Sequence, residues 1–98
     1  MKISNKIEEL QEKIKFLFFG EDEPDYIMIA FDSIINSSRK DKWTATIVYE
    51  NIGDGHPQYI DYGLEIGQYV LQGFGKNISG ALKDLETKIN RMLEDINK

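Results

Sequence analysis

The chain has 98 residues, a formal net charge of −5 and no cysteine. That length leaves room for one domain, residues 1–98, and the absence of cysteine excludes a disulfide framework and thiolate chemistry. Seventeen acidic residues against twelve basic ones argue against direct nucleic-acid binding, which depends on clustered positive charge. No apolar run reaches the ~20 residues that span a bilayer, and the first ten residues contain no signal-peptide segment. We therefore expect a cytoplasmic domain that contacts no membrane, and its richness in Ile, Lys and Asn is typical of an AT-rich bacterial or phage coding sequence.

An amphipathic helix is expected at the start of the chain. Asn5 is the favoured N-cap, because Glu8 then falls at the third helical position and can return a hydrogen bond. Gly20 is a natural stop, and Pro24 prevents any continuation. Apolar residues recur at three- and four-residue steps and form one stripe that should lie on a sheet: Ile3, Ile7, Leu10, Ile14 and Leu17. Three phenylalanines crowd the last turn and cannot all share this stripe: Phe16, Phe18 and Phe19. We favour the interpretation that all three complete the core; the alternative is that at least one covers the sheet edge or meets a partner.

Three segments alternate between apolar and other residues with the period of a half-buried strand: 26–35, 43–50 and 60–66. They predict an antiparallel meander. The apolar phase shifts at Gly67, as a bulge or corner requires. Residues 68–74 then either extend the third strand or form a short fourth.

One register brings the apolar side chains of all three strands to the same face. In the first pair of strands, Ile35 should lie opposite Trp43. In the second pair, Tyr49 should lie opposite Ile60, which places Trp43 opposite Ile66. A slip by one residue would scatter the apolar pairs over both faces.

A second amphipathic helix is expected at the end of the chain, with Ser79 as its N-cap. Its polar side alternates in charge, which is typical of a solvated face. Its apolar stripe fits either a sheet or a coiled-coil seam, and we favour the sheet because one is available: Ile78, Leu82, Leu85, Ile89, Met92 and Ile96. The sequence therefore predicts an α+β two-layer sandwich in the order helix, three or four antiparallel strands, helix, with both helices on one face.

The strand alternation also predicts a second sheet face that no helix covers. This face mixes carboxylates with a few apolar side chains, and we expect it to bind a protein partner through Met28, Asp32, Val48, Glu50, Tyr59, Asp61 and Glu65. Its carboxylates could occupy a basic nucleic-acid groove in an enzyme. One alternative is that its apolar residues meet a second copy of the chain, which gives a structural or regulatory homodimer. Another is that the acids only keep the sheet soluble.

The residues that could perform chemistry form no recognised constellation. His56 is the only histidine, it lies among turn residues, and no second His or Cys completes a transition-metal site. The acidic run at 21–25 lacks the spacing of a calcium loop. Asp61 and Glu65 are roughly 13 Å apart along a strand, beyond the ~9.5 Å limit of a glycosidase pair. We predict no catalytic residue, no metal and no cofactor, and hence a protein that is not an enzyme.

The order of elements, with a Gly-x-Gly turn at residues 73–75 before the last helix and Ala81 near its start, resembles the double-stranded RNA-binding domain. The topology covers most of the chain, and the motif covers residues 73–85. The resemblance implies an RNA contact through a lysine cluster at the start of that helix. This sequence departs from the family there, because Lys76 and Lys83 stand alone.

In size, acidity and composition the chain also resembles the small inhibitors that phages carry against host defences, anti-CRISPR proteins among them. Those inhibitors share no single fold or motif, so the resemblance assigns no residue roles. It implies a non-enzymatic module that captures a nucleic-acid-handling host enzyme. This is our functional hypothesis, with the homodimer and a degenerate RNA-binding domain as alternatives.

Overall fold

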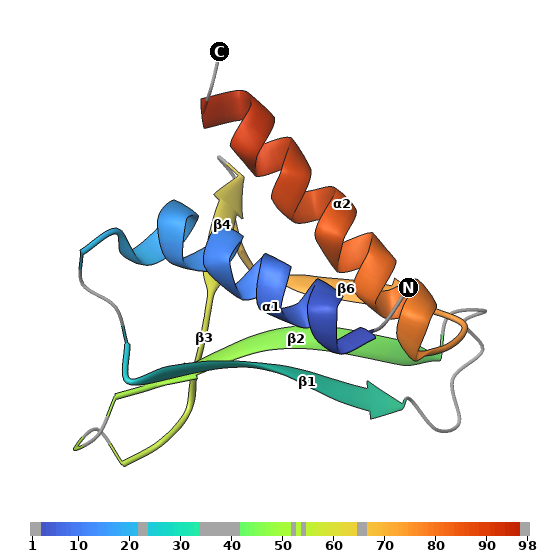
Figure 1. Cartoon of the computed structure of the whole chain (residues 1–98), viewed down its shortest axis with the longest axis horizontal. Helices are drawn as coiled ribbons and strands as arrows, with labels where there is room; N and C mark the ends of the chain where they lie inside the picture. Colours follow the sequence, from blue (N-terminus) through green and yellow to red (C-terminus); the bar gives the residue numbers. More distant parts are fainter. Residues whose placement is uncertain are drawn as a thin grey trace.

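The computed structural model describes residues 3–21, 24–33, 42–51, 53, 55–64 and 67–96. Both helices cover one face of the main sheet, so the predicted α+β two-layer sandwich is confirmed (Figure 1). None of the described helices is both long and apolar enough to cross a membrane. In chain order the elements are α1 (Ile3–Ile14), the π-helical turn η1 (Lys15–Phe19), β1 (Tyr26–Ser33), β2 (Trp43–Glu50), β3 (Gln58–Tyr59), β4 (Asp61–Leu64), β5 (Gly67–Val70), β6 (Gln72–Gly75) and α2 (Ile78–Ile96).

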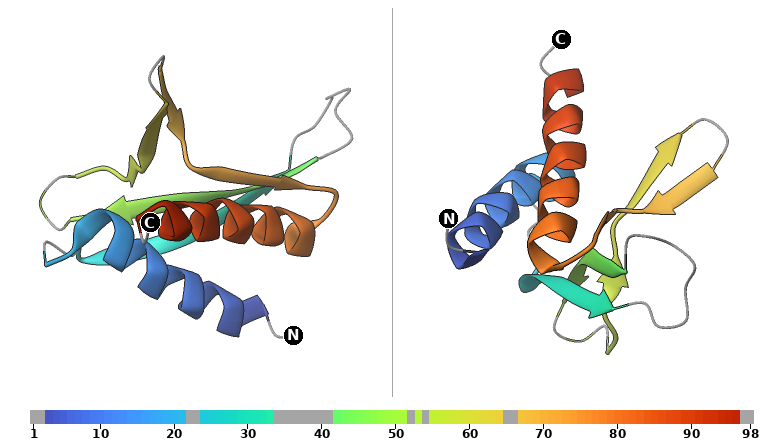
Figure 2. Two further views of the ribbon diagram at one scale, coloured as in Figure 1. Left: turned by 90° about the horizontal axis from the view of Figure 1, so that it is seen from above. Right: turned by 90° about the vertical axis from the view of Figure 1, so that its right-hand side faces the viewer.

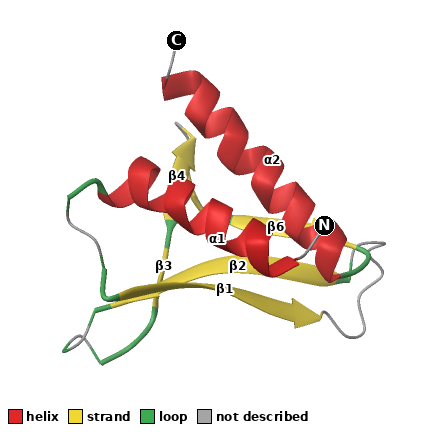
Figure 3. Cartoon of the chain, in the orientation of Figure 1, coloured by secondary structure: helices red, strands yellow, loops and turns green. Residues whose placement is uncertain are grey.

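Strand β2 lies at the centre of the main sheet. It pairs along its whole length with β1, and its other side is shared by β3 and β6 (Figure 3). All three pairings are antiparallel. Strands β4 and β5 pair only with each other, in a separate two-stranded sheet.

The register between β1 and β2 differs from the predicted one by two residues. Trp43 lies opposite Ser33 rather than Ile35, and Ile47 lies opposite Ile29. The apolar faces are nevertheless correct, because a shift of two residues keeps every side chain on its side of the sheet. Ile35 itself lies outside the described residues.

The prediction that the strand at residues 60–66 pairs with β2 is wrong for its described residues, 60–64. Tyr49 pairs with Gln58, and β3 ends one residue later at Tyr59. The chain then leaves β2 and forms the β4–β5 hairpin, which projects from the body apart from both helices (Figure 2). The apolar alternation does predict a strand, β4, but its partner is β5 and not β2.

A short fourth strand completes the sheet where the hairpin returns. Strand β6 takes up the edge of β2 that β3 has left, with Thr46 opposite Gln72. The backbone N–H of Leu71 donates to the carbonyl of Ile60 at 2.8 Å and closes the base of the hairpin. Gly67 is therefore not a bulge in one long strand but the first residue of β5, opposite Leu64.

The core lies between this sheet and the two helices. Most residues of the predicted helix stripes pack with β2 in this core, and Leu71 joins them from the base of the hairpin. Ile96, which the second stripe includes, is instead 57% exposed. The largest side chains that are fully buried come from both helices and from the sheet: Leu10, Ile14, Ile47, Leu71, Leu82, Leu85 and Ile89.

The helix ends depart from the predicted caps. Helix α1 begins at Ile3, so Asn5 lies inside it. The cap of α2 is Asn77 rather than Ser79, because the Asn77 Oδ1 accepts a hydrogen bond from the Gly80 N–H at 2.7 Å. An Asn side chain satisfies this orphan N–H as a Ser would, and Asn77 stands where α2 begins.

The favoured expectation that all three phenylalanines complete the core is wrong for Phe16. The helix widens into the π-helical turn η1 and stops at Gly20, whose N–H donates to the Lys15 carbonyl at 2.9 Å. Phe18 and Phe19 pack against the core, and the Phe19 ring meets Tyr49 edge-on with centroids 5.0 Å apart. Phe16 points away and is 67% exposed.

Two glycines allow α2 to lie directly on β6. A Cβ on Gly73 would overlap the Ala81 carbonyl oxygen, and a Cβ on Gly75 would overlap the Ala81 backbone nitrogen. The Gly-x-Gly turn is therefore a packing device in this chain, because any side chain would push the helix off the strand.

Helix α2 also covers the outer edge of β6 with two charged side chains. Asp84 Oδ2 accepts the Phe74 N–H at 2.9 Å, and Lys88 Nζ donates to the Gln72 carbonyl at 2.7 Å. The two side chains also pair with each other at 3.1 Å. These backbone groups would otherwise be open to another strand. Asp84 and Lys88 are thus exceptions to the expectation that this polar side is mostly solvated.

We predict that Gly75→Ala destabilises the protein by about 3 kcal/mol, because the new methyl group overlaps backbone atoms of α2 rather than a flexible side chain. The matched control is Gly80→Ala, where the nearest atom to the new Cβ is the Asn77 side-chain oxygen at 3.3 Å. Its stability should stay within ~1 kcal/mol of the wild type. Urea unfolding measures both, and equal losses would contradict close packing at Gly75.

Candidate functional site

The sheet face away from the helices carries a row of three side chains across three adjacent strands. Met28, Val48 and Tyr59 lie opposite one another in register on β1, β2 and β3. The two ends of the row are open to solvent, with Met28 44% and Tyr59 53% exposed. We call this row the apolar row.

A shallow hollow of about 270 Å³ adjoins the apolar row. Its polar side is held by hydrogen bonds: Gln72 Nε2 donates to Thr46 Oγ1 at 3.0 Å, and Thr44 Oγ1 donates to the Asp32 carbonyl at 3.3 Å. A partner could cover the apolar side of the hollow. The hollow is lined by Ala30, Asp32, Thr46, Val48, Tyr59, Val70 and Gln72.

The centre of this face is less open than the sequence suggested. Val48 was predicted to touch a partner, yet it is only 6% exposed, and Thr44 and Thr46 are buried beside it. These side chains belong to the central strand, so they are flanked on both sides by residues of neighbouring strands. A partner would therefore contact the ends of the apolar row, at Met28 and Tyr59.

The predicted carboxylates do not gather into one acidic cluster. Asp32 lies opposite Thr44 and Glu50 lies opposite Tyr26, at opposite ends of β1. Six residues of strand separate them, or roughly 20 Å. A hydrogen bond to Glu50, followed by desolvation, raises the pKa of the Tyr26 hydroxyl above its usual value, so Glu50 already has a neighbour in its own sheet.

The other two predicted acids are placed differently. Asp61 begins β4 and lies opposite Val70, so its backbone has left the main sheet. Glu65 lies outside the described residues. Two residues that the sequence did not single out line the hollow instead, Val70 and Gln72. The break in alternation near Gly67 was the signal that could have found them, because it moves the returning strand beside β2.

Comparison with family models, curated proteins and solved structures finds no match to this chain.

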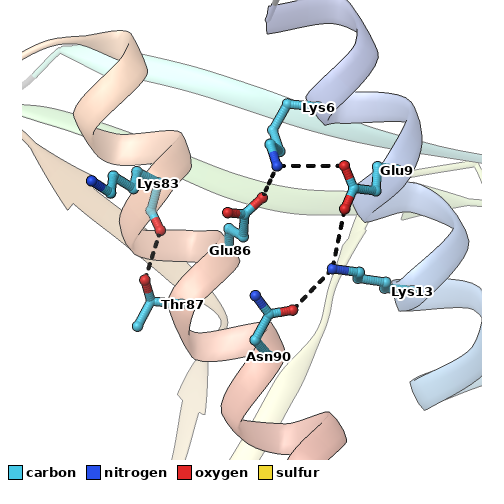
Figure 4. Close-up of polar contacts among 7 residues, drawn as sticks. All are labelled: Lys6, Glu9, Lys13, Lys83, Glu86, Thr87 and Asn90. Carbon is cyan, nitrogen blue, oxygen red and sulfur yellow. Dashed lines mark hydrogen bonds and ion pairs between the residues drawn. The ribbon is translucent and has the colours of Figure 1, made fainter. Parts of the chain in front are cut away.

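A second polar cluster joins the two helices (Figure 4). Lys6 Nζ lies 2.6 Å from the buried Glu86 Oε2 and 3.4 Å from Glu9 Oε2. Lys13 Nζ lies 3.3 Å from Glu9 Oε1 and donates to Asn90 Oδ1 at 3.0 Å. The four charges alternate in sign, so the cluster holds α1 against α2.

These contacts shift the pKa values of two members. The hydrogen bond to Glu86 is the largest cause that raises the pKa of Lys6 above 10.5. Hydrogen bonds from Lys13 and then Lys6 lower the pKa of Glu9 below 4.5. The raised pKa means that charged Lys6 stabilises the fold below pH 10.5. The lowered pKa means that ionised Glu9 stabilises it above pH 4.5.

A groove of about 390 Å³ lies beside this cluster at the start of α2. Its walls include Gly80, Leu82 and Lys83, with the Lys6–Glu86 pair at its base. This is the region where the RNA-binding resemblance would require free lysines. Lys83 is exposed, as is Lys76 nearby in the chain, whereas Lys6 is engaged by two carboxylates.

The described residues offer little for catalysis. His56 is exposed, as predicted for a surface loop. No group of three or more His, Cys, Asp or Glu side chains in the described ranges is placed to hold a metal ion. The expectation that the protein is not an enzyme stays a prediction.

We predict that Glu9→Gln reduces the loss of stability between pH 7 and pH 3, measured by urea unfolding at both values. In the wild type this carboxylate loses its contribution as the pH falls through its lowered pKa, and the amide has none to lose. Because two lysines lower the Glu9 pKa, Glu9→Gln should not alter the loss of stability between pH 7 and pH 3 in a Lys6→Met/Lys13→Met background. An undiminished effect in that background would show that the lysines are not the cause.

Proposed function

We propose that the chain is a non-enzymatic protein-binding module that uses the sheet face away from its helices. The observation that supports this most is the apolar row, because two large side chains at its ends are exposed in register on a face that no helix covers. Exposed apolar side chains grouped on one face are typical of interaction sites. Tyr59 is the natural anchor, since tyrosines are enriched among the residues that dominate binding energy.

We propose further that the partner presents a basic surface. Asp32 and Glu50 flank the apolar row at the two ends of β1, and the chain carries a net charge of −5. Carboxylates around an apolar centre favour a partner with Lys and Arg at the rim of its own site, and they mainly accelerate encounter. An enzyme that handles nucleic acid has such a rim, which is how a phage-type inhibitor of the anti-CRISPR kind would act here.

Direct RNA binding is the weaker alternative. The exposed described lysines near the start of α2 are Lys76 and Lys83, and each phosphate contact needs its own free cation. Retention on duplex RNA that falls with salt would favour this alternative over protein capture.

We predict that Tyr59→Lys reduces capture of the partner from a bacterial lysate by the immobilised protein at least tenfold, because the change removes the anchor and places a cation against a basic surface. The partner retained by the wild type is first identified by mass spectrometry and then quantified for each variant. Phe16→Lys is the matched control, since it adds the same charge at another exposed aromatic residue and should leave capture unchanged.

Recovery of the same partner in equal yield by Tyr59→Lys would contradict a contact through the apolar row. Val48→Glu is unsuitable for this test, because the buried Val48 side chain leaves no space for an uncompensated carboxylate. That variant would lose binding by unfolding.

A further inference from the structure

The outer edge of β1 carries backbone groups that no described strand satisfies. In an antiparallel pair, alternate residues direct both backbone groups toward the partner and the others direct them away. The Phe74 N–H and the Gln72 carbonyl point to α2, so Gly73 and Gly75 face β2. The register of β6 on β2 and of β2 on β1 extends this alternation to β1. The backbone groups that point outward there belong to Ile27, Ile29, Phe31 and Ser33.

The contact of one of these groups confirms the direction. The Ile27 carbonyl accepts a hydrogen bond from Gln11 Nε2 of α1 at 2.8 Å. The outward groups of Ile29 and Phe31 have no such partner among the described residues, and β1 pairs there with no strand but β2. The β6 edge is covered by Asp84 and Lys88, whereas in the described part of the chain the β1 edge is open beyond Ile27.

Apolar side chains line the open edge on both faces of the sheet. Ile29 and Phe31 face the helices and are only half buried, although they pack on the core. On the other face Met28 is exposed and Ala30 is half buried. A strand that paired here would satisfy the backbone and also cover side chains on both of its sides.

We propose that two copies of this chain associate through β1, edge to edge and antiparallel, around a two-fold axis at Ala30. In this register Ile29 of each copy lies opposite Phe31 of the other. The two equivalent pairs each form two hydrogen bonds, so four hydrogen bonds join the outward groups. Ile27 lies opposite Ser33 of the second copy, where the Gln11 contact can persist. The two main sheets become one continuous sheet.

A second copy fits this edge because β1 itself has the required apolar residues on both faces and because its ends differ in charge. Asp25 is exposed at the start of β1, and Glu50 lies opposite Tyr26. The exposed Lys42 precedes the residue that pairs with Ser33 at the other end. Antiparallel association brings Lys42 of each copy about two strand spacings, or ~10 Å, from the acidic end of the other.

The test is the mass of the protein in solution by light scattering over a concentration series. The wild type should approach twice the 11.3 kDa of one chain. Ile29→Pro removes an outward N–H, a change that an edge strand tolerates in the monomer. Because each copy loses one hydrogen bond of the interface, the variant should weaken the dimer roughly thirtyfold. A monomeric wild type at millimolar concentration, or a folded Ile29→Pro variant that dimerises as well as the wild type, would overturn the proposal.

A second pair of variants keeps the proposal testable if Ile29→Pro does not fold. Lys42→Glu and Lys83→Glu both replace an exposed lysine and change the net charge equally. Only Lys42→Glu should weaken the dimer, by roughly threefold to tenfold at low salt. Equal effects would mean that net charge alone is responsible, which contradicts the antiparallel β1 contact.

Hydrogen exchange locates the contact independently. The Ile29 and Phe31 amides should exchange slowly in the dimer and fast after dilution to monomer, whereas the Met28 and Ala30 amides stay protected by β2 in both. Tyr59→Lys should leave the dimer intact, so a failure of this proposal and a failure of the proposed function can be told apart.

Discussion

The main sheet depends on β2, which is hydrogen-bonded on both sides and has buried side chains on both faces. Its odd-numbered residues form the floor of the core, and Ala45 and Ile47 are fully buried there. Its even-numbered residues face the other way, yet Thr44, Thr46 and Val48 are also buried between the neighbouring strands. A strand in this position cannot shift without moving side chains on both faces, so it fixes where β1, β3 and β6 lie.

The faces of the strands could be predicted, but their partners could not. Alternation has a period of two, so it identifies which side of Ile29 and Ile47 is apolar but is unchanged when one strand slides by two residues. The same limit explains the hairpin. Residues 60–66 alternate as a strand paired with β2 would, and nothing in that period says that Tyr62 lies opposite Tyr69 instead.

The exposure of the candidate-site side chains could be predicted only in part, for a different reason. Met28 and Tyr59 were assigned to the open face and are exposed on it. The burial of Val48 depends on the size of the side chains that lie beside it across three strands. The one-dimensional pattern of the sequence does not contain that information. Asp84 and Lys88 were missed because alternating charge on a helix has the same pattern whether it faces water or covers a strand edge.

The two edges of the sheet differ because of how the helices lie on them. One helical turn advances about 5.4 Å, close to the ~6.7 Å of two strand residues, so side chains four apart on a helix can match alternate backbone groups of a strand. Helix α2 satisfies this condition on β6 with Asp84 and Lys88, and Gly73 and Gly75 let it approach closely enough. Among the described residues, the hydrogen bond from helix α1 to the outward groups of β1 is that of Gln11, so on our proposal β1 extends the sheet where β6 cannot. An added strand would lie next to Met28, which makes the open edge and the apolar row parts of one continuous surface.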